Sequence, residues 1–229
     1  METLFNGYTL EIAPGTFPLS TDSMALADFI RLPKQARILD LGSGCGTLGI
    51  LLCARDKSCK VTGIELQESA HNQALENISR NKLQDRLSSV CADLTGISDY
   101  LAPGSFEICI SNPPYFTAGY LSQSTPNARH EETCSLESLI RSAAWALKFG
   151  GDFYLVHKPE RLAEIITTAC MYKLEPKRMR LVRHQEGSPV SLLLIGFRKG
   201  AKPGLIWEES VLFDPKKQPT DYYKSIYHL

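Results

Sequence analysis

A glycine-rich loop directly after a short apolar strand is the feature that most restricts how this chain can fold. Residues 37–41 read Arg-Ile-Leu-Asp-Leu, and Gly42, Gly44 and Gly46 follow before apolar residues recur at helical spacing over 46–55. Glycine lets the backbone turn tightly and lets a ligand approach it closely. In open α/β sheets, ligands bind at the carboxyl ends of the strands, where this loop lies. The loop therefore predicts an α/β fold with a ligand site after its first strand.

Apolar strand-like segments alternate with helix-like segments through most of the chain, which favours a mainly parallel sheet with helices on both faces. Segments 174–182 and 191–198 are predicted to close the sheet as an antiparallel C-terminal hairpin. We thus expect a seven-stranded sheet. Its other strands are expected at 37–41, 60–66, 87–92, 106–111 and 152–157, and the helices at 46–55, 68–80, 135–149 and 159–172.

The length of 229 residues fits a single domain, since domains hold roughly 100–200 residues. We expect this domain to cover residues 1–215 and to begin with a helical lead-in over 1–35. Residues 216–229 are polar and contain three tyrosines, so we expect a loosely held C-terminal tail.

The composition excludes several classes of protein. Lys and Arg number 25 and Asp and Glu also 25, so the chain is not a polycation that binds nucleic acid by bulk charge. It has no run of about 20 apolar residues that could span a membrane, and its first residues lack the basic and apolar regions of a signal peptide, so none is expected. The seven cysteines show no CxxC spacing, so no metal site is expected. The sequence predicts a cytoplasmic protein.

A basic stretch near the predicted hairpin allows two interpretations. It consists of Lys173, Lys177, Arg178, Arg180 and Arg183. Lysine and arginine protect exposed strand edges from unwanted pairing, and they also contact nucleic-acid phosphates. Both interpretations stay open on the residues alone.

The spacing of the glycines and two acidic residues at strand ends indicate the kind of cofactor. The dinucleotide-binding fingerprint Gly-x-Gly-x-x-Gly, counted from Gly42, would place its third glycine at position 47, where this chain has Thr47. The spacing instead resembles the glycine loop of S-adenosylmethionine-dependent methyltransferases. Glu65 ends the second strand, where an acid can accept hydrogen bonds from ribose hydroxyls. Asp93 follows the third strand, where the resemblance implies a contact with the adenine amino group.

The segment Asn112-Pro113-Pro114-Tyr115 at the end of the fourth strand carries the reaction chemistry. An amino group conjugated to a purine, or an amide nitrogen, is a poor nucleophile because its lone pair is delocalised. The Asn112 side-chain oxygen and the Pro113 carbonyl can each accept a hydrogen bond from one of the two N–H groups of such a nitrogen. Proline fixes φ, which keeps the two acceptors preorganised. The ring of Tyr115 can stack on a flipped base.

The chain is similar to bacterial tRNA1(Val) (adenine(37)-N6)-methyltransferases over nearly its whole length. The resemblance lies in residues 19–23, 127–131, 156–162 and 174–178, together with the Asn-Pro-Pro-Tyr segment. It implies a Rossmann-like class I methyltransferase fold, a transfer from S-adenosylmethionine to adenine N6, and tRNA as the partner. It further implies that Thr21 reaches the methionine end of the cofactor. The other cofactor-binding residues so implied are Asp40, Gly42, Gly44, Gly46, Glu65, Leu66, Asp93, Leu94 and Asn112. It also implies that Asn112, Pro113, Pro114 and Tyr115 are catalytic. For the tRNA substrate we expect contacts from Phe116 and, in the basic stretch, from Lys177, Arg178 and Arg180.

Three other functions remain open. The same catalytic segment serves methylation of guanine N2 in rRNA or of a protein glutamine amide, and a chain with this loop could also be a catalytically silent cofactor-binding module. Only 41 residues precede Gly42, too few for the helical domain that glutamine methyltransferases carry there. This favours an RNA substrate.

Overall fold

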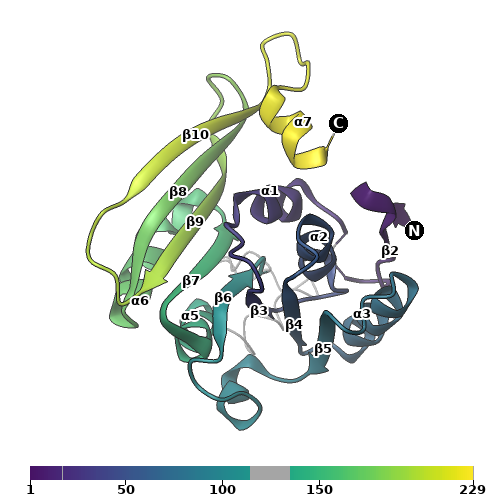
Figure 1. The fold of residues 1–229 in the computed structure, drawn as a ribbon. Helices are drawn as coiled ribbons and strands as arrows, with labels where there is room; N and C mark the ends of the chain where they lie inside the picture. Colours follow the sequence, from purple (N-terminus) through teal and green to yellow (C-terminus); the bar gives the residue numbers. More distant parts are fainter. Residues whose placement is uncertain (17, 114–134, 229) are drawn as a thin grey trace, which may run out of the picture.

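An eight-stranded sheet forms the centre of the computed structural model, which describes residues 1–16, 18–113 and 135–228 (Figure 1). The strands lie in the order β10-β8-β9-β7-β6-β3-β4-β5. All neighbouring pairs are parallel except β7 with β9 and β8 with β9. The strands are β3 (Arg37–Leu41), β4 (Lys60–Glu65), β5 (Leu87–Cys91), β6 (Phe106–Ser111), β7 (Leu147–His157), β8 (Leu174–Gln185), β9 (Val190–Lys199) and β10 (Ile206–Phe213).

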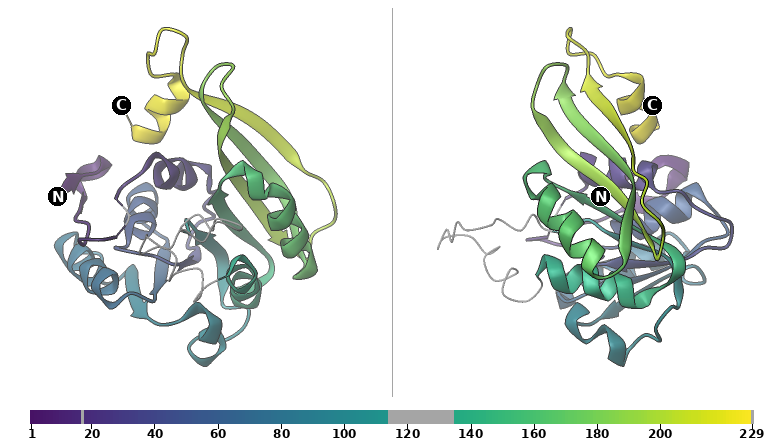
Figure 2. Two further views of the ribbon diagram at one scale, coloured as in Figure 1. Left: turned by 180° about the vertical axis from the view of Figure 1, so that it is seen from behind. Right: turned by 90° about the vertical axis from the view of Figure 1, so that its left-hand side faces the viewer.

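Helices cover both faces of this sheet, as the two further views in Figure 2 show. Successive strand residues point to opposite faces, so Ile38 packs with helices α1 and α2 whereas Leu39 packs with α5 and α6. The helices are α1 (Thr21–Phe29), α2 (Thr47–Arg55), α3 (Glu68–Arg80), α5 (Leu136–Ala146), α6 (Leu162–Met171) and α7 (Asp221–Tyr227). Short elements are β1 (Glu2–Thr3), η1 (Phe5–Gly7), β2 (Thr9–Leu10), η2 (Leu94–Asp99) and η3 (Pro159–Arg161). None of the described helices combines the length and apolar character of a membrane span.

The expected fold class is confirmed, but the sheet has eight strands instead of seven. The additional strand, β10, runs parallel to β8 and forms the outer edge of the sheet. Its Ile206 and Trp207 are exposed, and Glu208 and Glu209 interrupt its apolar residues, so it lacks the buried apolar run of the central strands. A strand at the edge of a sheet is held by one neighbour only and does not need such a run.

The boundary between α5 and β7 was predicted wrongly. The helix expected over 135–149 ends at Ala146, and Leu147 already pairs with Phe106 at the start of β7. Gly150 and Gly151 lie inside β7, which contains additional residues relative to β6 at this point. Among the described residues of the expected helical lead-in, only those of α1 are α-helical.

The C-terminal tail also differs from the expectation, because residues 221–227 form helix α7 and lie against α1. Ile226 of this helix is buried in the same core cluster as α1 and α2. The tail is therefore part of the packed structure. The extent of the single domain, 1–215, stays a prediction.

The basic stretch of β8 is covered by β10 and α1. Arg178 donates to Glu208 of β10 at 2.7 Å through Nη2, and its guanidinium lies 4.3 Å from the ring centroid of Phe29. Arg180 donates through Nη1 to Asp28 of α1 and through Nη2 to Glu208, each at 3.1 Å. The expectation of an exposed strand edge is wrong, since β8 has a neighbour on each side. The positive charges instead join the edge strand and α1 to the sheet.

Replacing Arg180 with alanine should destabilise the protein. The Arg180 side chain is only 12% exposed, so its loss leaves Asp28 and Glu208 partly buried without this partner. Both carboxylates are about one-third or more exposed, and solvent screening reduces the cost to about 1–3 kcal/mol of unfolding free energy. Urea unfolding measures this difference. Arg141→Ala, at an exposed position of α5, is the control and should change the unfolding free energy little. Equal stability of the two variants would contradict the structural role.

Candidate active site

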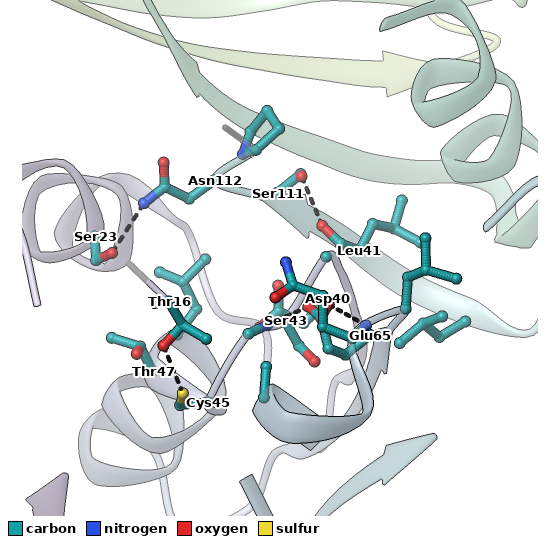
Figure 3. A pocket seen from close by; sticks show the side chains of 18 of the residues that line it. Thr16, Ser23, Asp40, Leu41, Ser43, Cys45, Thr47, Glu65, Ser111 and Asn112 are labelled. Carbon is teal, nitrogen blue, oxygen red and sulfur yellow. Dashed lines mark hydrogen bonds between the residues drawn. The ribbon is translucent and has the colours of Figure 1, made fainter. Parts of the chain in front are cut away.

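A cavity of about 350 Å³ lies at the carboxyl ends of β3, β4 and β6, where the glycine loop begins (Figure 3). The parallel register brings these ends together, because Asp40 of β3 lies opposite both Gly63 of β4 and Ile110 of β6. Nine of the predicted site residues line the cavity. They are Asp40, Gly42, Gly44, Glu65, Leu66, Asp93, Leu94, Asn112 and Pro113.

The glycine loop provides an open floor for this cavity. Gly42 and Gly44 have φ values of +74° and +55°, a region that side-chain-bearing residues rarely adopt. A Cβ added at either glycine would meet no atom within 4 Å. The two glycines therefore serve the turn itself and leave space in which a ligand can contact the backbone. Gly46, the third glycine, does not line the cavity and instead caps the start of α2.

Glu65 is held rigidly at the end of β4. Its Oε2 accepts a hydrogen bond from the Gly44 backbone at 2.8 Å, and its Oε1 accepts one from the Gln67 backbone at the same distance. A carboxylate has about four acceptor positions, so two remain for a ligand. Asp93 is similarly fixed, because one of its oxygens accepts from the Thr95 backbone at 2.8 Å. Both acids face the cavity with defined orientations.

Asp40 is the most unusual group in the cavity wall. Its side chain is 1% exposed, and neither of its carboxylate oxygens has a hydrogen-bond partner among the described residues. Burial, and secondly the negative charge of Glu65, raise the pKa of Asp40 to about 8. A buried polar group without a partner costs free energy, so this site favours a ligand that donates hydrogen bonds or carries positive charge.

Asn112 lies at the opposite side of the cavity, directly after β6. The preceding residue, Ser111, donates through Oγ to the Leu41 carbonyl at 2.7 Å and so joins the ends of β6 and β3. The Asn112 side chain donates through Nδ2 to Ser23 Oγ at 2.9 Å, as Figure 3 shows. The predicted Pro114, Tyr115 and Phe116 and the segment 127–131 lie outside the described residues.

Thr21 does not line the cavity, although it was expected at the methionine end of the cofactor. Its hydroxyl shares a 2.8 Å hydrogen bond with the Tyr227 hydroxyl of α7. Its neighbours Ser20, Asp22 and Ser23 line the cavity instead. Burial raises the pKa of Asp22, and the positive charge of Lys158 partly opposes this shift. Adjacent residues of a helix point about 100° apart, and which of them faces the cavity is set by how α1 packs.

Sequence reasoning also missed Ser43, Thr16 and Gln67, which line the cavity through the loop conformation and the approach of the N-terminal segment. The proposed phosphate contacts Arg178 and Arg180 are engaged in the ion pairs described above, and Lys177 donates to the Lys202 carbonyl at 3.1 Å. Among the described residues, no group of three or more His, Cys, Asp or Glu side chains could hold a metal ion.

Comparison with known proteins identifies similar chains. A family model described as the methyltransferase small domain matches residues 18–174. A tRNA1(Val) (adenine(37)-N6)-methyltransferase from Bacteroides thetaiotaomicron is 29% identical over 211 residues, which cover 91% of this chain and 87% of that protein. One of the same name from Photobacterium profundum is 32% identical over 181 residues, 77% and 75% of the two chains.

Solved structures share the fold. Atu636 from Agrobacterium tumefaciens, described as a predicted O-methyltransferase, has a TM-score of 0.76 at 23% identity, covering 91% of this chain and 96% of that one. TrmN from Thermus thermophilus has a TM-score of 0.59 at 18% identity, covering 77% and 48%. At these identities the likeness concerns the fold alone.

The buried carboxyl group of Asp40 should make stability depend on pH in the cofactor-free protein. The folded state keeps the Asp40 proton up to about pH 8, whereas the unfolded chain releases it near pH 4. The folded state therefore binds more protons between these values, and the unfolding free energy falls as pH rises. Asp40→Asn removes this contribution. Between pH 5 and pH 8, the unfolding free energy should fall by about 4 kcal/mol less in the variant than in the wild type, since each pH unit over which the folded state alone keeps the proton is worth about 1.4 kcal/mol. Urea titrations of both proteins at the two pH values measure this difference. An equal fall of the unfolding free energy in the variant and in the wild type would contradict it.

Proposed function

Because the chain belongs to the tRNA1(Val) (adenine(37)-N6)-methyltransferase family, we propose that it methylates the N6 amino group of adenine 37 in a valine tRNA. The methyl donor is S-adenosylmethionine, and a tRNA substrate implies a cytoplasmic location. The observation that carries the proposal is the position of Asn112, whose amide stands across one cavity from the glycine loop and the two fixed acids.

The residues around the cavity fit S-adenosylmethionine. The cofactor has an ammonium group and a sulfonium, both positive, and the unpartnered carboxylate of Asp40 suits a cationic or hydrogen-bond-donating ligand. The open backbone at Gly42 and Gly44 suits a group that approaches the main chain closely. We assign the ribose hydroxyls to Glu65 and the adenine amino group to Asp93, with Leu66 and Leu94 beside the two acids. When bound, the cofactor supplies an electrophilic methyl group.

The contribution of the protein is to hold the target amine. Asn112 Nδ2 already donates a hydrogen bond to Ser23. This leaves Asn112 Oδ1 to accept a hydrogen bond from one N–H group of the target amine. The Pro113 carbonyl is the second acceptor. Two acceptors fixed on the amine hydrogens favour the geometry in which the nitrogen lone pair points away from the ring system, toward the methyl group. This is preorganised electrostatic and positional catalysis and requires no strong base. Tyr115 and Phe116 are proposed to stack against the flipped base.

A direct transfer assay tests this function. The protein is incubated with labelled S-adenosylmethionine and an unmodified valine tRNA transcript, and the nucleosides are analysed by mass spectrometry. We expect N6-methyladenosine, and none from a transcript in which adenine 37 is replaced by guanine. Parallel incubations contain rRNA or total protein in place of the transcript. Label that appears there as N2-methylguanosine or methylglutamine, with none in the tRNA, would contradict the adenine assignment. No transfer to any of these substrates, despite cofactor binding, would indicate a silent binding module.

Replacing Asn112 with alanine should abolish most of the transfer and leave the cofactor bound. Loss of one preorganised hydrogen-bonding group in an active site lowers kcat by about 100-fold or more. The cofactor dissociation constant should stay within a few-fold of the wild-type value, as measured by calorimetry. Asn72→Ala, at an exposed position of α3, serves as the control and should retain full activity. Near-normal activity of the Asn112 variant would refute the mechanism.

A further inference from the structure

The first turn of α1 lies between the candidate catalytic amide and the C-terminal helix. Ser20 caps this helix, and its Oγ accepts a hydrogen bond from the Ser23 backbone at 3.4 Å. Thr21 and Ser23 are two positions apart, so their side chains point to nearly opposite sides of the helix. One of them contacts α7 and the other contacts Asn112.

The contact with Ser23 holds the Asn112 amide in place and leaves its Oδ1 for a substrate. Ser23 is 5% exposed, and its Oγ accepts a hydrogen bond from Asn112 Nδ2 at 2.9 Å. Oδ1 is then the amide atom that remains to accept a hydrogen bond from an N–H of the target amine. The hydrogen bond to Ser23 restricts movement of the Asn112 side chain and so keeps Oδ1 at one position.

Helix α7 holds the same turn from its other side. Tyr227 shares its 2.8 Å hydrogen bond with Thr21. The Tyr227 ring stacks on Tyr223 with centroids 4.6 Å apart, and Tyr223 in turn lies 4.9 Å from the ring of Phe213 at the end of β10. These ring contacts hold the Tyr227 hydroxyl in place for its hydrogen bond to Thr21 in the first turn of α1.

The opposite end of α1 is fixed by a second contact of α7. The guanidinium of Arg180 lies 4.9 Å from the ring centroid of Tyr222 and is paired with Asp28 near the end of α1. Helix α7 thereby contacts α1 near its first residue directly and near its last residue through Arg180. A helix held at both ends can neither tilt nor slide without breaking one of these contacts.

We propose that Ser23 is a positioning residue for methyl transfer, and that α7 keeps it in place through the Tyr227–Thr21 hydrogen bond. This inference rests on the proposed function, since it assumes that Asn112 Oδ1 holds the target amine. It assigns a role in the reaction to a C-terminal segment that lies outside the cavity.

Ser23→Ala tests the first part. We expect kcat on the valine tRNA transcript to fall about 10- to 100-fold, because the amide is no longer held in one orientation. The KM for tRNA should change less than threefold. The cofactor dissociation constant and the melting temperature should stay close to wild type. Ser191→Ala, which removes a hydroxyl bonded to the Val182 carbonyl in the β8–β9 pair, is the control and should keep its kcat.

Two outcomes would overturn this part. One is an unchanged kcat in Ser23→Ala, and the other is a fall that merely follows a loss of stability or of cofactor binding. An active wild type with such a result would leave the proposed function standing. A wild type that transfers no methyl group to adenine would contradict the proposed function, and this inference with it.

Tyr227→Phe tests the second part, because it removes only the hydroxyl and keeps the ring. We expect a three- to tenfold lower kcat, with cofactor affinity unchanged. Tyr223→Phe is a matched control on the same helix, since no hydrogen bond of the Tyr223 hydroxyl is found among the described residues, and it should keep wild-type kcat. If both variants behave alike, α7 has no specific part in positioning.

The double variant Ser23→Ala/Tyr227→Phe shows whether the two residues act together. If Tyr227 acts through the turn that carries Ser23, the double variant should lose little more than Ser23→Ala alone, since coupled residues give non-additive effects. A loss equal to the product of the two single losses would show that Tyr227 acts independently and would overturn the coupling.

Discussion

The parallel pairing of β3 with both β4 and β6 is the constraint on which the site depends. Parallel strands all end at one edge of a sheet, so the residues that follow them meet there regardless of their distance in the sequence. The Ser111 hydroxyl reinforces this edge by donating to the Leu41 carbonyl, 70 positions earlier in the chain. The glycine loop and Asn112 then extend from neighbouring strand ends, and the cavity between them is a consequence of the pairing.

The parts of the structure that could be predicted from sequence are those determined by local pattern. Segments 37–41 and 106–111 are apolar, short and buried on both faces, and their strands have the predicted bounds. Glu65 and Asp93 were identified because the end of a strand is itself a local feature. The helix over 68–80 followed from its spacing of apolar residues and has the predicted bounds as well.

The remaining features depend on distant contacts that no local pattern records. Strand β10 carries two glutamates among its apolar residues, and they pair with Arg178, Arg180 and Arg183 of β8. Taken separately, the sequences of β8 and β10 each have the charged residues of a solvent-exposed segment. Ser23 was passed over in favour of Thr21 because the direction of each side chain is set by where α1 packs. The charges of β8 were open to two interpretations, and neither includes the partners that Arg178 and Arg180 have in the structure, which lie about 30 positions later and in α1.

The distance between Thr21 and Tyr227 along the chain, 206 positions, also affects the order in which the protein can mature. During synthesis the chain emerges from its N-terminus, and elements made early can pack as soon as their neighbours exist. The first turn of α1 emerges long before α7, which carries its anchor. The restraint on the turn beside Asn112 can therefore form only after α7 has been made. A chain that ends before α7 lacks the hydrogen bond between Tyr227 and Thr21.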